Sequence, residues 1–259
     1  MKKKILLPIL AFAILLTAIA VIFSNIKNKN KEPETTLETT TTQEETTTEP
    51  PTKAYETDEN YTRKIDFDSL KATNPDVIAW VYIPGTVIDY PILWKEYDIE
   101  YYLHHDINHQ ESYYSVYMDG YSNSDFSTLN NIIYGHHMKD GTMFNNLLNY
   151  DDPEYAKAHD TIEVDYVNGG KKTYRVFAYG KTDALKKGFN VYDYVNIQNK
   201  GDFNAYIKGV KSMTKKDTGI TPKWGDNIIT LSTCSYHSEE GRYVVVAVEI
   251  KDDSKSREK

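Results

Sequence analysis

The sequence predicts a mainly β fold, a closed or nearly closed eight-stranded β-barrel with helical insertions. Eight short segments between residues 78 and 250 are rich in β-branched and aromatic residues, and several alternate apolar and polar positions as half-buried strands do. Turn sequences separate them, and Asn168-Gly169 between two such runs is typical of a β-hairpin. Many short strands in one domain favour a barrel.

The expected elements follow one another along a domain of about 190 residues. A helix opens it, because Asp66 can cap a turn that carries Phe67 and Leu70, and Asn74-Pro75 then interrupts the pattern. Val77 and Ile78 could extend the apolar face of this helix. The expected strands are Ile78–Ile83, Val87–Leu93, Ser115–Met118, Asn131–Tyr134, Thr161–Val167, Thr173–Tyr179, Ile228–Thr233 and Tyr243–Ile250. Further helices are expected at Met143–Leu148, Pro153–His159 and Asp202–Met213.

The composition limits the function. The chain has 259 residues, with 38 acidic against 30 basic residues and a net charge of −8. A nucleic-acid binder would show a basic excess, so no nucleic-acid partner is expected. The single cysteine excludes an internal disulfide and any cysteine-based zinc or iron–sulfur site. A mean hydropathy of −0.59 excludes a polytopic membrane protein.

An uncharged apolar run from Ile5 to Phe23 has about the length that spans a bilayer as a helix. A cleaved signal peptide is the alternative, because Ala18-Ile19-Ala20 has the small-x-small pattern of a cleavage site. The run continues past Ala20 and is long for a signal-peptide core, which favours an uncleaved anchor. Three lysines stand on each side of the span. The short tail before it, residues 1–4, is expected in the cytoplasm, with the C-terminal domain outside.

Residues 24–59 are expected to form a disordered stalk. Ten threonines and three prolines lie between Pro33 and Thr52, and residues 32–59 carry nine acidic side chains against the single Lys53. Such a segment cannot bury enough apolar surface to fold, and its charge keeps it extended. The folded domain is then residues 60–252, followed by a disordered tail at 253–259.

Cys234 ends an apolar strand and stands beside polar residues. A lone cysteine is usually a small buried hydrophobe, but a free thiol at a strand end can also face a cleft. Arg242 lies eight residues further on, after a turn sequence and at the start of the returning strand. The two would then be neighbours across a hairpin, where a guanidinium favours the thiolate and can hold an oxyanion. A solvent-exposed strand-end arginine is the alternative.

His136 and His137 follow another apolar strand. Adjacent residues of an extended chain point to opposite faces, so at most one of them can share a cleft with the cysteine. An imidazole beside a thiol supplies a general acid and base near neutral pH. The i, i+4 spacing of His105 and His109 could instead hold zinc on a helix, but the helical pattern there is weak and a third ligand is lacking, so no metal site is favoured.

The sequence resembles the sortases, the cysteine transpeptidases of Gram-positive cell surfaces. Thr230-Leu231-Ser232-Thr233-Cys234 looks like their TLxTC signature, and Tyr134-Gly135-His136 and Arg242 fit beside it. The stretches 74–80, 83–86, 88–91, 101–103 and 134–144 look like class B members, as does the helix Asp202–Met213 before the seventh barrel strand. One stretch, Tyr113–Asp119, departs from the family pattern because it begins with two tyrosines where smaller residues are usual.

The resemblance implies that Cys234 is the nucleophile, His136 the catalytic histidine and Arg242 the essential arginine. It also implies that Leu103, Tyr134, Ser232 and Thr233 line the groove for the sorting signal, and that no cofactor or metal is needed. The expected substrates are secreted proteins with a C-terminal Pro-x-Thr-type sorting signal, cleaved after Thr, and the expected acceptor is a peptidoglycan amine or a pilin lysine. The alternatives are a hydrolytic cysteine peptidase and a non-catalytic cell-surface binding domain on the same scaffold.

Overall fold

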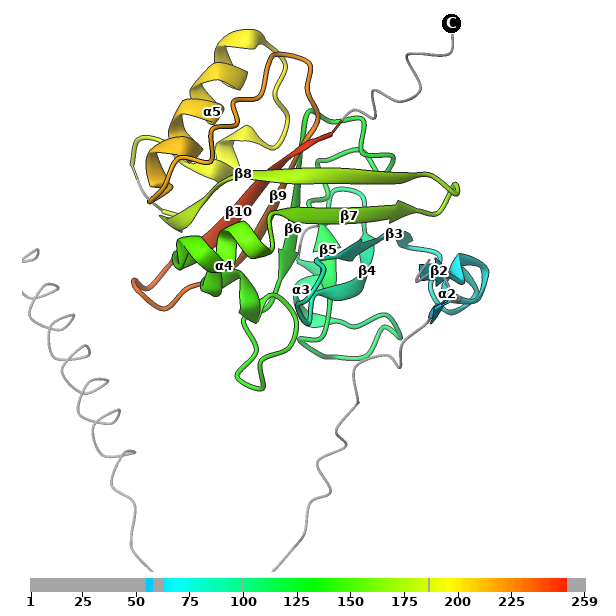
Figure 1. Ribbon diagram of the computed structural model, residues 1–259. Helices are drawn as coiled ribbons and strands as arrows, with labels where there is room; N and C mark the ends of the chain where they lie inside the picture. The colour runs from blue at the N-terminus through cyan, green and yellow to red at the C-terminus, as the bar shows by residue number, and fades with distance from the viewer. Residues whose placement is uncertain (1–54, 58–62, 99, 186, 251–259) are drawn as a thin grey trace, which may run out of the picture. The chain divides into compact units, whose positions relative to one another are not determined.

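Eight strands close into a barrel in the order β10-β8-β7-β3-β4-β5-β6-β9, which confirms the predicted fold (Figure 1). The computed structural model describes residues 55–57, 63–98, 100–185 and 187–250. Neighbouring barrel strands are antiparallel except for the β4–β5 and β6–β9 pairs, which are parallel. The barrel strands are β3 (Val77–Tyr82), β4 (Asp89–Trp94), β5 (Val116–Met118), β6 (Asn130–Gly135), β7 (Thr161–Tyr166), β8 (Lys171–Asp183), β9 (Ile228–Cys234) and β10 (Gly241–Glu249).

A separate two-stranded sheet precedes the barrel. Its strands, β1 (Tyr55–Thr57) and β2 (Arg63–Ile65), pair antiparallel. β1 lies within the stretch expected as the stalk. The remainder of the stalk, the segments 1–4 and 5–23 and the tail 253–259 lie outside the described residues. Within the described part, no helix is both long and apolar enough to cross a bilayer.

The opening helix forms as predicted. It is α2 (Phe67–Thr73), capped by Asp66, whose carboxylate accepts a hydrogen bond from the Ser69 backbone N–H at 3.0 Å. Val77 belongs to β3 and not to the helix, because the chain is already extended at Asn74. Asn74 is fully buried and donates to the Ile107 carbonyl at 3.0 Å, which ties the helix end to the loop after β4.

Some of the other helical segments differ from expectation. The helix expected at Met143–Leu148 is the 3₁₀ helix η1 (Asn145–Asp151), because Met143 has a φ of 53° and cannot belong to a right-handed helix. A short helix that the sequence does not predict, α3 (Tyr101–His104), precedes β5. The predicted helix at 153–159 is α4 (Pro153–Ala158), which begins with proline after the capping Asp152.

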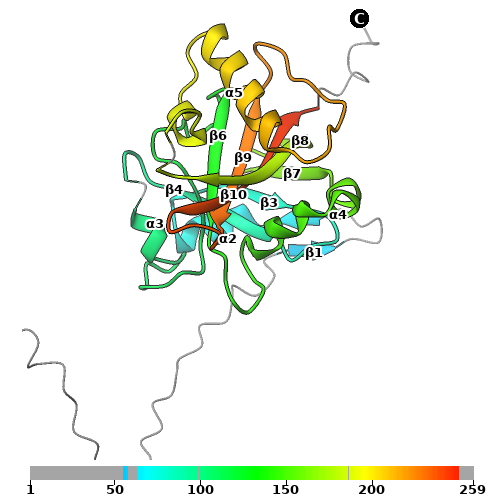
Figure 2. The same cartoon turned by 90° about the vertical axis from the view of Figure 1, so that its left-hand side faces the viewer.

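The long helix before the seventh barrel strand is α5 (Lys200–Met213), as predicted, and it follows the 3₁₀ helix η2 (Val191–Tyr194). Its buried side chains Phe203, Tyr206, Ile207 and Val210 recur at helical spacing and pack against outward-facing residues of the barrel strands. Figure 2 shows α5 beside the barrel strands. The Tyr206 hydroxyl hydrogen-bonds the Thr230 hydroxyl on β9. This connection therefore covers the outside of β9 beside the strand end that carries Cys234.

Alternation along β9 and β10 sets which side chains face the barrel interior. Leu231 and Val245 belong to the central core, whereas Val244 and Val246 belong to the cluster under α5. Because side chains alternate along a strand, Arg242 lies on the same outward face as Val244. The catalytic candidates therefore stand on the outer wall of the barrel and not inside it.

Candidate active site

The register of one hairpin brings Cys234 and Arg242 together. Cys234 is the last residue of β9, and its Cα partner on β10 is Arg242. The Ser235 N–H donates to the Gly241 carbonyl at 2.9 Å and closes the turn. A Cβ on Gly241 would stand 2.0 Å from the Ser235 carbonyl oxygen, so this tight closure requires glycine. The predicted hairpin neighbourhood is thus confirmed.

Neighbouring groups orient the Arg242 guanidinium. One terminal nitrogen donates to the Glu240 carboxylate at 3.0 Å, and the other donates to the Gly241 carbonyl at 3.0 Å. The side chain of Arg242 is 28% exposed, so the ion pair is partly shielded from water. A guanidinium has five N–H donors, and these two contacts leave others for an oxygen of a bound substrate.

His136 follows β6 directly and is held by the α3 segment. Its Nε2 lies 2.9 Å from the Leu103 carbonyl oxygen. A carbonyl oxygen can only accept, so Nε2 carries the hydrogen of this bond, and Nδ1 is the nitrogen that can release or take up a proton. Gly135 permits the approach of the buried Phe144 ring, because a Cβ there would lie 2.6 Å from Phe144 Cγ.

Burial lowers the pKa of His136 below its ordinary value of 6.5, and the nearby His104 lowers it slightly further. The hydrogen bond to Leu103 acts in the opposite direction and favours the protonated ring. Because burial is the largest of these effects, neutral imidazole is favoured near neutral pH. The ring is thus available as a base at Nδ1 without prior loss of a proton.

His137 takes no part in this arrangement. Its ring stacks on Tyr236, with the centroids 5.4 Å apart, and its backbone bridges to Met143. It is not among the residues that line the groove beside Cys234. The prediction that only one of the two adjacent histidines shares the cleft is therefore confirmed.

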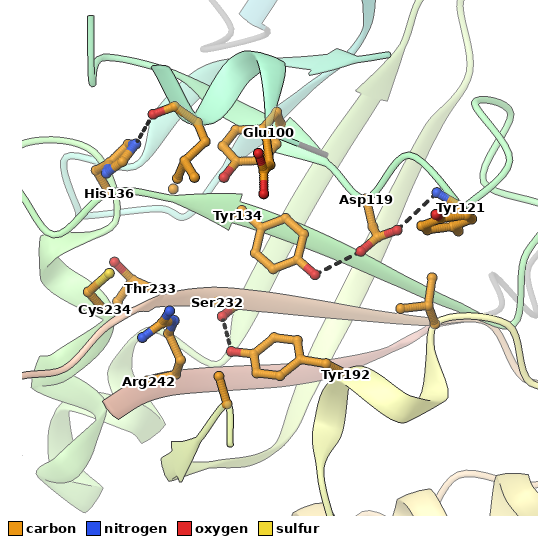
Figure 3. A pocket seen from close by; sticks show the side chains of 15 residues that line it. Glu100, Asp119, Tyr121, Tyr134, His136, Tyr192, Ser232, Thr233, Cys234 and Arg242 are labelled. Carbon is orange, nitrogen blue, oxygen red and sulfur yellow. Dashed lines mark hydrogen bonds between the residues drawn. The ribbon is translucent and has the colours of Figure 1, made fainter. Parts of the chain in front are cut away.

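A groove of about 450 Å³ runs along the outer wall from the catalytic candidates. Figure 3 shows His136, Cys234 and Arg242 together at one end, and Asp119 and Tyr121 at the other. The four residues that the resemblance assigned to substrate binding, Leu103, Tyr134, Ser232 and Thr233, all line it. Lining residues that the sequence did not indicate are Glu100, Tyr117, Asp119, Tyr121, Gly135, Ala184, Tyr192 and Val195.

Two tyrosines form the floor of this groove. The Tyr134 hydroxyl donates to the Asp119 carboxylate at 2.8 Å, and burial together with that carboxylate raises the pKa of Tyr134 well above its ordinary value. The Tyr192 hydroxyl lies 2.7 Å from the Ser232 hydroxyl, and burial raises the pKa of Tyr192 to about 12. Both phenols therefore stay neutral at physiological pH. No motif marks Tyr192 in the sequence, because η2 reaches the groove only through the packing of the α5 connection.

The histidines considered for zinc serve the local fold instead. His105 stacks on the Tyr101 ring with the centroids 4.4 Å apart, and its Nδ1 lies 2.8 Å from the Tyr101 carbonyl oxygen. His109 Nδ1 lies 3.0 Å from the Tyr101 hydroxyl. Across the described ranges, no group of three or more His, Cys, Asp or Glu side chains could hold a metal ion.

A thiol, an imidazole and a guanidinium at one end of a groove on a β-barrel wall are the groups that a cysteine-dependent acyl-transfer enzyme uses. The sequence model of the Sortase domain matches residues 81–250, so the chain belongs to the sortase family. Its role as a cysteine transpeptidase follows from that membership.

The relatives place the chain with class B, as the resemblance implied. It is 32% identical to Sortase B of Listeria monocytogenes over 195 residues, which cover 74% of this chain and 77% of the relative. The Staphylococcus aureus sortase B–substrate complex superposes with a TM-score of 0.64 at 31% identity and covers 72% of this chain and 85% of that one. Sortase B complexed with triglycine gives a TM-score of 0.63 at 31% identity and covers 72% and 86%.

Proposed function

We propose that this chain is a membrane-anchored class B sortase that cleaves a Pro-x-Thr-type sorting signal after Thr and transfers the acyl group to an amine of the cell wall or of a pilin. One observation carries the proposal: Cys234, His136 and Arg242 come from three different strand ends and meet at one end of a groove. The volume of that groove, about 450 Å³, lies in the range of ligand-binding pockets.

In the first half-reaction, the Cys234 thiol passes its proton to Nδ1 of the neutral His136 ring, and the resulting thiolate attacks the carbonyl carbon of the threonine. The resulting oxyanion is stabilised by the Arg242 guanidinium, whose remaining donors are free of the Glu240 contact. The C–N bond then breaks, and His136 gives a proton from Nδ1 to the leaving amine. The products are a thioester on Cys234 and the released C-terminal part of the signal.

In the second half-reaction, an acceptor amine attacks the thioester carbonyl. His136 takes the proton of this amine at Nδ1, while Nε2–H stays bonded to the Leu103 carbonyl. The C–S bond breaks, an amide forms, and Cys234 leaves as the thiolate, which takes the proton back from Nδ1. The complex of a related sortase B with triglycine supports an amine acceptor of the oligoglycine type.

The proposed location rests on the sequence. The apolar run Ile5–Phe23 would anchor the chain as a single N-terminal span, with the tail in the cytoplasm and the barrel outside a Gram-positive cell. The threonine- and glutamate-rich stretch that follows would space the domain from the membrane. In this position the groove can meet secreted proteins and cell-wall amines.

The test uses the chain from residue 49, where the unit that holds the barrel begins. We would incubate it with a panel of Pro-x-Thr peptides, with and without triglycine, and record mass spectra of the intact protein and of the products. An acyl adduct on Cys234 together with an amine-ligated product is expected. Cys234→Ala, with an unchanged circular dichroism spectrum, should form neither.

The other outcomes separate the alternatives. Turnover that gives only the acid with every amine offered would indicate a hydrolytic peptidase. A folded protein whose thiol is inert toward both peptides and thiol reagents would indicate a non-catalytic binding domain. Retained turnover in folded Cys234→Ala would exclude the proposed mechanism.

A further inference from the structure

Tyr113 touches the catalytic histidine from outside the groove. Its ring centroid lies 5.1 Å from that of His136, and the two planes meet at 70°. The side chain is 54% exposed, and it is not among the residues that line the groove. Tyr113 can therefore influence the imidazole without contacting the peptide. It also begins the stretch where the sequence departs from the family pattern.

The loop that carries Tyr113 is fixed by contacts that do not involve the active site. The Ser112 N–H donates to the His104 carbonyl at 2.9 Å, and the backbones of His105 and Glu111 form a β-bridge. The buried Asp106 carboxylate accepts hydrogen bonds from the N–H groups of Asn108 and Gln110. These contacts hold the backbone next to Tyr113 in place independently of the contact between Tyr113 and His136.

The same segment also supplies the other contact to His136. The Leu103 carbonyl, near the end of α3, accepts from Nε2, while Tyr113 packs on the ring a few residues later. A single hydrogen bond leaves an imidazole free to swing about the bond axis, and an aromatic contact at a steep angle removes that freedom. The residues 103–113 therefore hold the ring from two directions.

We propose that Tyr113 is a positioning residue, which holds the imidazole of His136 with Nε2–H on the Leu103 carbonyl and Nδ1 turned to the groove. The kinetic part of this inference rests on the proposed function, whereas its effect on the ring does not. The charged and titratable groups around His136 are His104 and Glu100 from the α3 segment, Cys234 from β9 and Arg242 from β10. Tyr113 adds no charge to this set.

Loss of the Tyr113 ring should admit water to the imidazole. Burial is the main cause of the lowered pKa of His136, so the pKa should rise toward 6.5 when the cover is removed. The neutral ring should also populate both tautomers, because the bond to Leu103 is no longer enforced. The kcat should fall by about tenfold or more, since a displaced base is costly to catalysis, while KM for the peptide stays within about twofold.

The experiment compares Tyr113→Ala, Tyr113→Leu and Tyr113→Phe in the full-length chain in detergent micelles. Nitrogen-15 histidine NMR would follow the titration and tautomer of His136, identified by its loss in His136→Asn, and steady-state kinetics would follow kcat and KM. Tyr113→Phe should match the wild type in both readouts. Tyr236→Ala is the matched control, because it removes an exposed tyrosine from His137 and should leave the titration of His136 unchanged.

The Leu variant preserves side-chain bulk, so it decides the question if the Ala variant does not fold. A raised pKa and a mixed tautomer in the Ala or Leu variant, restored by Phe, support the inference. Wild-type titration of His136 in every folded Tyr113 variant would overturn it. The NMR result stands even if no peptide is turned over, so failure of the proposed function is distinguishable from failure of the positioning role.

Discussion

Cys234 and Arg242 are directly opposite Cα partners in the antiparallel ladder between β9 and β10. The distance between their backbones is therefore set by backbone hydrogen bonds and not by side-chain packing. Substitutions of other side chains that line the groove should leave this distance unchanged. Because the two strands are joined by a tight turn, the thiol and the guanidinium are positioned by one local unit. Only His136 must be brought to them from elsewhere in the chain.

Replacement of Arg242 by lysine tests the role of the guanidinium. An ammonium keeps the charge but lacks the planar fork, so it cannot hold Glu240 and an oxyanion together. We expect kcat to fall by about 10²-fold or more, with KM for the peptide little changed. The control is Arg175→Lys on β8, which makes the same change at a residue that forms an ion pair with Asp160. Equal activity of Arg242→Lys and the wild type would exclude an oxyanion role.

The lowered pKa of His136 predicts a pH-dependent stability. Between 6.5 and the folded-state pKa, the unfolded chain holds a proton on His136 that the folded chain does not. The wild type should therefore lose stability relative to His136→Asn as the pH falls through this window, and the loss is complete below the folded-state pKa. Urea denaturation of both proteins at about pH 8 and about pH 5 measures the difference. A difference that stays constant or grows in favour of the wild type would contradict the burial of a neutral ring.

The barrel was predictable because its strands carry local signals. β7 alternates buried and half-buried positions over its whole length, and β9 is rich in the β-branched residues isoleucine and threonine. The errors lie where a tertiary contact overrides the local pattern. Met143 adopts a positive φ in contact with Tyr90, whose hydroxyl accepts from the Met143 N–H at 3.1 Å, and this delays the expected helix. α3 is too short for a helical period to be visible in the sequence.

The site was predictable in part for the same reason. Cys234 and Arg242 lie within one hairpin, so their approach follows from a turn and a register. The residues alone offered His136 or His137, and the choice of His136 came through the resemblance, because β6 reaches β9 by a parallel pairing across about a hundred residues. Tyr113 and Tyr192 could not be assigned to the site, since each arrives from a connection whose path depends on packing.

The pair formed by Tyr192 and Ser232 predicts a coupling energy. Their hydroxyls lie 2.7 Å apart in the groove, so Tyr192→Phe and Ser232→Ala should each lower the free energy of unfolding by about 1 kcal/mol. The double variant should lose about 0.5–1.5 kcal/mol less than the sum, because neither hydroxyl is then left unpaired. Urea denaturation of the four proteins completes the cycle, and strict additivity would show that the bond contributes nothing.

The pKa of Tyr192 also predicts a pH–rate profile. Since this pKa is about 12, the profile of Tyr192→Phe should keep the wild-type midpoints.

Substitution of Gly135, which directly precedes His136, tests how the packing of the core affects both stability and catalysis. An added methyl group would stand 2.6 Å from Cγ of the fully buried Phe144 ring, so the ring or the strand would have to shift. Gly135→Ala should therefore lower the free energy of unfolding by roughly 1–3 kcal/mol through overpacking. It should also displace the adjacent His136 and lower kcat more than it raises KM.

Gly170→Ala is the control, because a methyl group there would stand no closer than 3.3 Å to its neighbours at a hairpin end. Its cost in unfolding free energy should stay within about 0.5 kcal/mol. Two results would contradict this prediction: equal stability of the two variants, or wild-type stability and full activity of Gly135→Ala. Either would show that the packing of Phe144 against β6 does not set the position of His136.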